Sequence, residues 1–349
     1  MDEKVVFDRI SGSLLGGAAG DALGYAVEFM SWDAIARDYG ANGIESYELS
    51  QNSGKALVSD DTQMTLYSAA GALAYAQACP DAFDLAALRA ALYDAYLHWY
   101  RTQYPNQRIA SSRSYWLDEV SELRNRRAPG NTCLSALGSG RCGSISNSLN
   151  SSKGCGGVMR VAPLGCFRRS MTSLEVAFAG AESSAITHGH SLGYIPGAMA
   201  ALLVHKCVFR ETERSFAELA REAFEETFDI FGGDAHWATF HALVETAFEL
   251  ARSDGDCRQH FLRLGEGWVG EEALAVALYC ALRWNDDFDR CLISSVNHDG
   301  DSDSTGAIAG NLLGAYLGRG RVAEKWLAEL ELRDVIERIA RELCQAALR

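Results

Sequence analysis

Residues 11–24 read SGSLLGGAAGDALG, and residues 306–318 read GAIAGNLLGAYLG. The first segment carries a glycine at every fourth position, at Gly12, Gly16, Gly20 and Gly24. The second repeats this spacing at Gly306, Gly310, Gly314 and Gly318. Positions four apart share one face of an α-helix, so each segment predicts a helix with a ridge of glycines. Each mid-helix glycine costs about 1 kcal/mol relative to alanine. Close packing of the two helices at the centre of the protein would explain that cost, as would separate tight contacts of each ridge.

Two acidic clusters lie at opposite ends of the chain, each directly before an apolar helical pattern. Residues 59–62 read SDDT, and residues 298–305 read HDGDSDST. Adjacent carboxylates repel one another, so crowding them into short turns is costly unless a cation compensates. Carboxylates and hydroxyls together form the all-oxygen ligand set that Mg²⁺, Mn²⁺ or Ca²⁺ prefers. We expect both clusters to lie at helix N-termini and to meet at one metal site, with Asp21 and Glu28 close to Asp301 and Asp303.

The composition favours one domain over residues 1–349. Clusters at opposite ends of the chain can share a site only if the whole chain folds together. The chain has 349 residues, is 48% hydrophobic and carries a formal charge of −14, which argues against a nucleic-acid or anionic-membrane binder. Its 10 cysteines show no paired spacing and suit a reducing compartment. The acidic start lacks a signal-peptide pattern, and no uninterrupted apolar run approaches a membrane span of about 20 residues. We therefore expect a cytoplasmic protein.

The periodicity predicts an all-α fold, because apolar residues recur three and four apart while strict alternation is rare. Helices are expected over residues 10–24, 62–78, 84–100, 174–186, 195–209, 216–231, 237–251, 271–284, 305–317 and 322–348. The glycine-, serine- and asparagine-rich residues 125–153 are expected to form a long loop. Pro196 is expected at or near a helix boundary.

Several motifs allow more than one interpretation. Asp299, Asp301 and Asp303 match the first three ligand positions of a calcium-binding EF-hand loop, but Ser304 and Gly310 break the rest of that pattern. Helix capping alone would explain single acidic or hydroxyl residues before a helix. The turn at residues 152–160, SKGCGGVMR, fits neither a Walker loop nor a dinucleotide-binding fingerprint. Its glycines would suit an anion-binding nest or a flexible loop end.

Two single residues also allow more than one interpretation. His188 would suit a ligand contact or a structural hydrogen bond. Glu28, between Val27 and Phe29, would suit acid–base chemistry if its carboxylate is desolvated, or a surface position if it is not.

Taken in order, these motifs resemble the ADP-ribosylglycohydrolase family over nearly the whole chain. The resemblance runs through five segments, residues 20–28, 59–62, 154–163, 187–188 and 300–304. It implies a compact orthogonal all-α domain with two Mg²⁺ or Mn²⁺ ions at its centre. The implied reaction is hydrolysis of the glycosidic bond at C1″ of ADP-ribose attached to a protein side chain, with arginine as the acceptor by family analogy.

The resemblance also implies roles for individual residues. Metal ligands fall on Ser59, Asp60, Asp61, Asp301, Asp303 and Ser304. Catalytic carboxylates fall on Glu28, Asp60 and Asp61. Ligand-binding positions fall on Asp21, Gly154, Cys155, Gly156, Gly157, Met159 and His188. Serine stands at 59 and 304 where family members often have threonine, and both residues supply a hydroxyl.

Two other functions remain open from sequence. A binding protein of the same fold would read ADP-ribose or act as an immunity protein against a partner ADP-ribosyltransferase toxin. An HD-type metal phosphohydrolase would use His298 and Asp299, but it leaves the two acidic clusters unexplained. The implied partners are therefore ADP-ribosylated proteins, ADP-ribose itself and, under the immunity hypothesis, a toxin.

Overall fold

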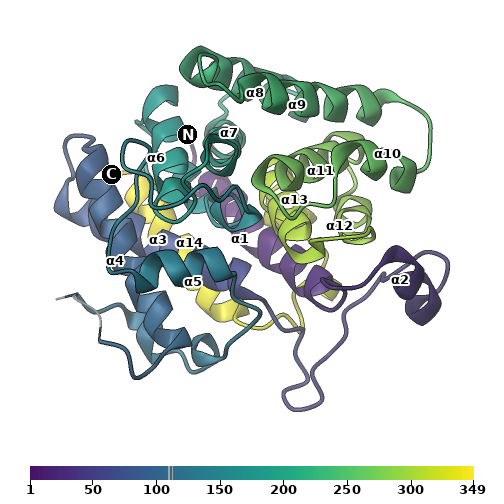
Figure 1. Ribbon diagram of the computed structural model, residues 1–349, viewed down its shortest axis with the longest axis horizontal. Helices are drawn as coiled ribbons and strands as arrows, with labels where there is room; N and C mark the ends of the chain where they lie inside the picture. Colours follow the sequence, from purple (N-terminus) through teal and green to yellow (C-terminus); the bar gives the residue numbers. More distant parts are fainter. Residues whose placement is uncertain (109–110, 112) are drawn as a thin grey trace.

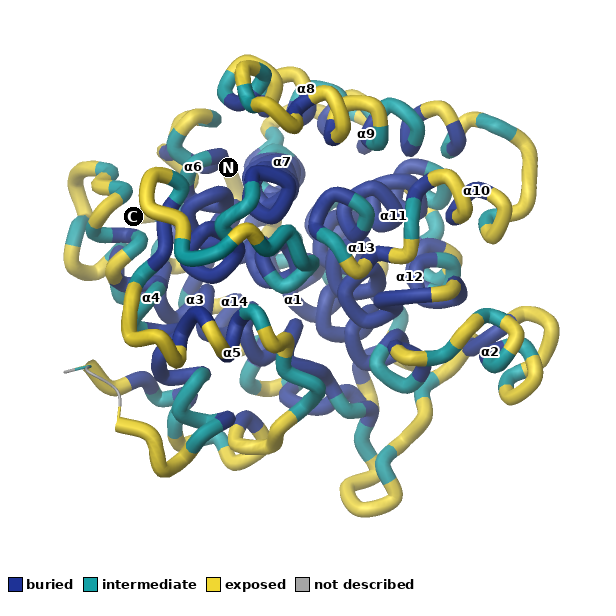
Figure 2. Tube along the Cα trace, viewed as in Figure 1, coloured by how far each residue is buried: buried dark blue, intermediate teal, exposed yellow. Residues whose placement is uncertain are grey.

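A computed structural model describes residues 1–108, 111 and 113–349 of the chain. Within these residues the only β-structure is isolated bridges, so the predicted all-α class is confirmed. The described residues form fourteen α-helices, which pack together into a continuous apolar core (Figures 1 and 2). Their bounds are α1 (Glu3–Tyr25), α2 (Trp32–Tyr39), α3 (Asp60–Ala78), α4 (Leu85–Gln103), α5 (Asn131–Gly138), α6 (Ser173–Ala185), α7 (Ser191–Phe209), α8 (Phe216–Phe231), α9 (Trp237–Arg252), α10 (Cys257–Leu264), α11 (Gly270–Arg283), α12 (Phe288–Val296), α13 (Ser302–Leu317) and α14 (Arg333–Ala347).

The two glycine ridges pack against each other at the centre of the molecule, as the sequence predicts. A Cβ placed on Gly16 would lie 2.5 Å from the carbonyl oxygen of Gly310, and one placed on Gly306 would lie 2.5 Å from that of Gly20. Real Cβ atoms essentially never approach so closely, so only glycine permits this spacing of backbones. The pairing order is antiparallel, and it brings the C-terminal end of α1 beside the N-terminal end of α13 (Figure 1).

Both acidic clusters begin helices. Ser59 caps α3 by accepting a hydrogen bond from the Asp61 amide, and Asp60 and Asp61 occupy the first turn. Asp301 caps α13 by accepting from the Ser304 amide, with Asp303 in the first turn. Negative charge is favoured at these positions because helix N-termini expose unpaired N–H groups. The α1–α13 pairing therefore carries the turn after α1, which holds Glu28, to the start of α13.

The remaining helices complete the core around this pair. Helix α7 is long and apolar enough to cross a membrane, but 83% of the relevant window is buried inside the fold. A core helix passes the same test. Helices α8 and α9 lie along one edge of the molecule and keep an exposed outer face (Figures 1 and 2).

The structure corrects three predictions. The expected helix over residues 322–348 is wrong: α14 begins only at Arg333, after two short 3-10 turns and a left-handed Leu332 (φ 62°). The expected loop over 125–153 contains α5. Pro196 lies within the second turn of α7, which begins at Ser191, rather than at a boundary.

Candidate metal and active site

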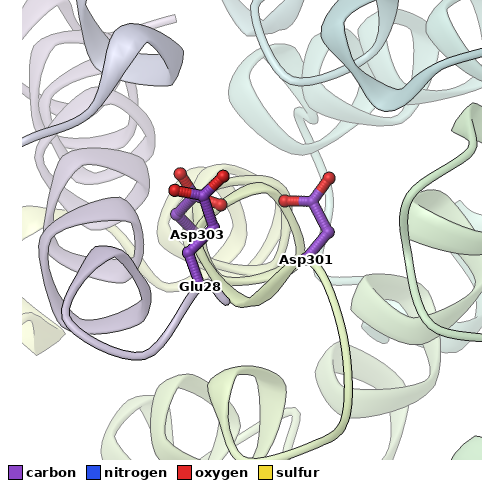
Figure 3. Close-up of side chains that lie close together, drawn as sticks. All are labelled: Glu28, Asp301 and Asp303. Carbon is purple, nitrogen blue, oxygen red and sulfur yellow. The ribbon is translucent and has the colours of Figure 1, made fainter. Parts of the chain in front are cut away.

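Three carboxylates meet where α1 ends and α13 begins. Glu28, Asp301 and Asp303 each offer an oxygen, and these oxygens all lie within 4.8 Å of one another (Figure 3). All three side chains are buried. Gly300, at φ 139°, shapes the turn before them, because a Cβ there would overlap the backbone of Glu266. The Asp301 amide donates to the Glu266 carbonyl at 2.8 Å, which fixes this turn.

The first turn of α3 supplies the facing carboxylates, Asp60 and Asp61. Asp60 Oδ2 accepts a hydrogen bond from the Gly130 amide at 3.3 Å. Asp60 and Asp61 line the same cavity as Asp301, Asp303 and Ser304. The two acidic clusters therefore meet in one cavity, as the sequence predicts. Two oxygens in this group, Glu28 Oε2 and Asp61 Oδ2, are buried and have no hydrogen-bond partner among the described residues.

Asp21 and Ser59 lie behind this carboxylate group. The carboxylate of Asp21 accepts from the amides of Ser59, at 2.9 and 3.1 Å, and Thr62, at 3.0 Å. Both Asp21 and Ser59 are fully buried, and neither lines the cavity described below. In this structure Asp21 of α1 therefore positions the start of α3.

Burial raises the pKa of five of the acids in this region, and mutual repulsion adds to the effect for four of them, Glu28, Asp60, Asp61 and Asp303. Burial, then the charges of Asp301 and Asp60, raises the pKa of Glu28 to about 8. Burial is also the main cause that raises the pKa of Asp60 to about 8 and that of Asp21 to about 6. Burial and the neighbouring carboxylates raise the pKa of Asp61 and Asp303 as well. Such a group either takes up protons or binds cations.

A divalent-metal site fits these residues. The donor set is carboxylates and a hydroxyl, which hard cations such as Mg²⁺ and Mn²⁺ prefer. Two of its buried oxygens are otherwise unpaired. Asp299, the remaining acid of the C-terminal cluster, does not belong to the group: it is exposed, and its carboxylate accepts from the Trp32 amide.

The carboxylates line one end of a cavity of about 370 Å³, a volume in the range of small-ligand pockets. Gly154, Cys155 and Gly156 line it as well and begin a short 3-10 helix (Cys155–Gly157) without a side-chain cap. The thiol of Cys155 donates to Asp301 Oδ2 at 2.7 Å. Gly157, the last residue of this short helix, packs against α7, where a Cβ would meet the backbone of Gly193. The glycine turn therefore borders the metal end directly.

His188 and Met159 support this turn. His188 is 2% exposed, and burial followed by the charge of Arg160 lowers its pKa to about 3, so the imidazole is neutral. Its ring lies against Gly154 and Gly156, where Cβ atoms would come within 3.3 and 3.1 Å of it. Met159 Sδ accepts from the Ser304 hydroxyl at 3.9 Å. Both side chains line the cavity.

Sequence reasoning missed part of the wall. Residues 128–133, in or just before α5, line the cavity beside the glycine turn, and Phe29 and Trp268 line it too. The apolar spacing of Cys133, Leu134 and Leu137 was the available signal for α5. An isolated aromatic residue carries no comparable signal.

The pKa shifts predict how magnesium affects stability at different pH values. Because the folded-state pKa of Glu28, about 8, lies above its ordinary value of 4.5, this group favours the fold most below pH 4.5 and loses that contribution as pH rises towards 8. Metal-free protein should therefore lose this stability between these pH values, whereas bound cations favour the charged form. We expect the gain in melting temperature on adding Mg²⁺ to increase from pH 5 to pH 8. Glu28→Gln should flatten that increase, and a gain that does not change with pH would contradict the assignment.

Comparisons with known proteins agree with this geometry. The profile of the ADP-ribosylglycohydrolase family matches residues 2–349. ADP-ribosylhydrolase ARH3 of Bos taurus is 27% identical over 212 residues, which cover 55% of this chain and 57% of that protein. The match to ARH3 thus spans little more than half of that relative's length. The ADP-ribosyl-[dinitrogen reductase] glycohydrolase of Rhodospirillum rubrum is 25% identical over 98% of this chain and 96% of its own.

A solved structure described as an ADP-ribosylglycohydrolase-related protein complex has a TM-score of 0.66, with 22% identity and 99% coverage of both chains. That similarity supports the fold. Since the family profile matches almost the entire chain, this protein belongs to the ADP-ribosylglycohydrolase family.

Proposed function

We propose that this protein is a divalent-metal-dependent hydrolase that releases ADP-ribose from modified protein side chains, with arginine as the preferred acceptor. One observation carries the proposal: five carboxylates and a glycine turn without a side-chain cap line the same cavity and border each other. The carboxylates suit a sugar bound through metal ions, and the adjoining turn suits a pyrophosphate. In ADP-ribose the reacting ribose is joined directly to the pyrophosphate.

We assign two Mg²⁺ or Mn²⁺ ions to Asp60, Asp61, Asp301, Asp303 and Ser304. Ser59, the N-cap of α3, would hold Asp60 and Asp61 in place. Bound ions would orient the hydroxyls of the reacting ribose and lower the pKa of an attacking water. The carboxylates would also stabilise positive charge that develops on the sugar ring.

Glu28 is the side chain best placed to receive a proton. It lines the cavity, and one of its oxygens lies within 4.8 Å of oxygens of Asp301 and Asp303. Its buried Oε2 has no hydrogen-bond partner among the described residues. In the proposed reaction, water oxygen bonds to C1″ as the bond from C1″ to the acceptor nitrogen breaks. The carboxylate of Glu28, or of Asp60 or Asp61, accepts a proton of that water and passes it to the leaving nitrogen, so that the acceptor side chain is released as a free guanidinium.

The glycine turn has a positive charge behind it. Arg160 is fully buried and donates to the Ser183 carbonyl and the Thr187 hydroxyl, each at 2.8 Å. Among the described residues it forms no ion pair with a carboxylate. The amides of Gly154 and Cys155 donate to Ser152 Oγ and to the Trp268 carbonyl. The guanidinium of Arg160 and the amides of Gly156 and Gly157 would favour a pyrophosphate beside the turn, even though the protein carries net negative charge.

The charge of the cavity supports arginine as the acceptor. Its described lining contains five carboxylates and no lysine or arginine. A cationic guanidinium group can therefore enter the cavity without meeting a side chain of like charge. A poly-ADP-ribose chain, which is polyanionic, would find none of the cationic side chains that bind such polymers.

A panel of ADP-ribosylated substrates tests the proposal. Arginine-, serine- and thymidine-linked ADP-ribose and poly-ADP-ribose would each be incubated with the protein and Mg²⁺, and released ADP-ribose would be measured. We expect release from the arginine linkage and about a 100-fold lower kcat for Glu28→Gln. Glu45→Gln, an exposed glutamate between α2 and α3, is the matched control and should retain full activity.

Other outcomes separate the alternatives. Tight binding of ADP-ribose without release from any linkage would favour the binding or immunity function, including a toxin partner. The HD-type alternative has little support from geometry, because the imidazole of buried His298 is engaged by the Ser295 carbonyl and the Thr305 hydroxyl and does not line the cavity.

A further inference from the structure

Phe29 and Trp268 are conspicuous at the mouth of the cavity. Among the described residues eight large hydrophobic side chains are exposed, and these two are the members of that group that line the cavity. Phe29 is 74% exposed and Trp268 is 39% exposed. Their rings are stacked, with centroids 5.9 Å apart and planes at 17° (ordinary geometry for an aromatic pair). Leaving so much aromatic surface in water is unfavourable unless another group covers it.

Phe29 is attached to the carboxylates, and Trp268 lies between them and the glycine turn, because its carbonyl accepts from the Cys155 amide at 3.2 Å. Phe29 directly follows Glu28 in the turn after α1. Trp268 lies in the loop before α11, where Glu266 accepts from the Asp301 amide at 2.8 Å and donates its own amide to Glu272 at 3.1 Å. Gly265 and Gly267 adopt φ values of 101° and 84°, which glycine accommodates readily. The loop therefore presents Trp268 from a fixed backbone.

We propose that Phe29 and Trp268 form an aromatic clamp, in which the exposed outer faces of the stacked rings bind the acceptor side chain, and that this clamp favours a planar guanidinium group. The proposal rests on the function proposed above, because it takes the reacting ribose to lie at the carboxylates. The bond from that ribose to the acceptor then lies beside the two rings. In ADP-ribose the adenine is at the opposite end of the molecule, beyond the pyrophosphate and the second ribose.

Guanidinium suits the clamp for two physical reasons. It is flat and delocalised, so it stacks on aromatic faces and gains cation–π attraction. In addition, the described cavity lining supplies no lysine or arginine that would compete for those faces. A serine-linked acceptor has neither a flat group nor a charge at the corresponding position.

The test compares Phe29→Ala/Trp268→Ala with the unmodified protein. The substrates would be two peptides, one with ADP-ribose on arginine and the other with ADP-ribose on serine. The affinity for free ADP-ribose would be measured separately. For the arginine-linked peptide we expect KM to rise about tenfold with little change in kcat. The KM for the serine-linked peptide and the Kd for free ADP-ribose should each stay within about twofold of the values for the unmodified protein. These ligands do not place a guanidinium group at the rings.

Two further variants provide controls. Trp268→Phe, which keeps an aromatic ring, should retain most of the affinity for the arginine-linked peptide. Leu174→Ala removes another exposed hydrophobic side chain away from the cavity lining and should change nothing.

Three results would contradict the clamp. The double variant could weaken binding of free ADP-ribose as much as binding of the arginine-linked peptide, it could raise KM equally for both peptides, or it could leave KM unchanged for both. If the unmodified protein released nothing from the arginine-linked peptide, the proposed function itself would fail, which is a separate result.

Discussion

Asp303→Asn is expected to abolish most activity and, at the same time, to stabilise the metal-free protein. Loss of a metal ligand should lower the rate of ADP-ribose release by at least about 100-fold, since removing even an outer-shell partner of a ligand commonly costs 10- to 100-fold. Asp303 lies within 4.8 Å of Glu28 and Asp301, and asparagine removes one of these like charges without changing the volume. Without metal, the free energy of unfolding should therefore rise by about 1 kcal/mol, the equivalent of roughly one pKa unit.

Thermal melts of both proteins with and without Mg²⁺ would check this expectation. The unmodified protein should gain melting temperature with Mg²⁺, and Asp303→Asn should gain much less. Asp299→Asn is the matched control, because Asp299 belongs to the same turn but is exposed and contacts the Trp32 amide. If Asp303→Asn destabilised the metal-free protein and retained the response to Mg²⁺, the repulsive carboxylate group would be the wrong description of this site.

Gly16→Ala is expected to destabilise the protein strongly although alanine is the better helix former. Its Cβ would lie 2.5 Å from the Gly310 carbonyl oxygen and 3.2 Å from the Phe288 ring. The first neighbour is backbone and cannot rotate away, so α1 and α13 would have to separate along their length. We expect a loss of about 3 kcal/mol in the free energy of unfolding, beyond the gain of about 1 kcal/mol that alanine brings to an isolated helix. Gly16→Val should prevent folding.

Urea unfolding of Gly16→Ala and Gly233→Ala would measure this effect. A Cβ added to Gly233 would meet no heavy atom within 4 Å, so its substitution should be neutral. Because α1 and α13 also carry Glu28, Asp301 and Asp303, Gly16→Ala should weaken Mg²⁺ binding as well. A neutral Gly16→Ala would show that the ridge spacing is not required for close packing.

The centre of this fold was accessible from sequence because its signals are physical constraints on spacing and charge. Glycines four apart predict close helix packing, and α1 and α13 have that packing. Clusters of carboxylates before helices predict a shared site, and the common cavity lined by Asp61 and Asp303 confirms that they meet. The position of Glu28 follows from these two facts, since antiparallel packing carries the end of α1 to the start of α13.

Features that depend on tertiary contacts were not accessible in this way. The start of α14 is set by a left-handed Leu332 and a buried Trp326, and neither conformation nor burial can be read from an amphipathic pattern. Asp21 was expected to bind ligand, but in the structure its carboxylate holds the amides of α3. Phe29 and Trp268 are far apart in the sequence, and only the fold places their rings together.

The central claim is that the two acidic clusters share divalent cations. Crystals soaked in Mn²⁺ would test it most directly through the anomalous signal of the metal. The account predicts two Mn²⁺ peaks in the cavity between Asp60 and Asp61 of α3 and Asp301 and Asp303 of α13. A map in which this cavity holds no Mn²⁺, or in which an ion contacts the carboxylates of one helix alone, would contradict it.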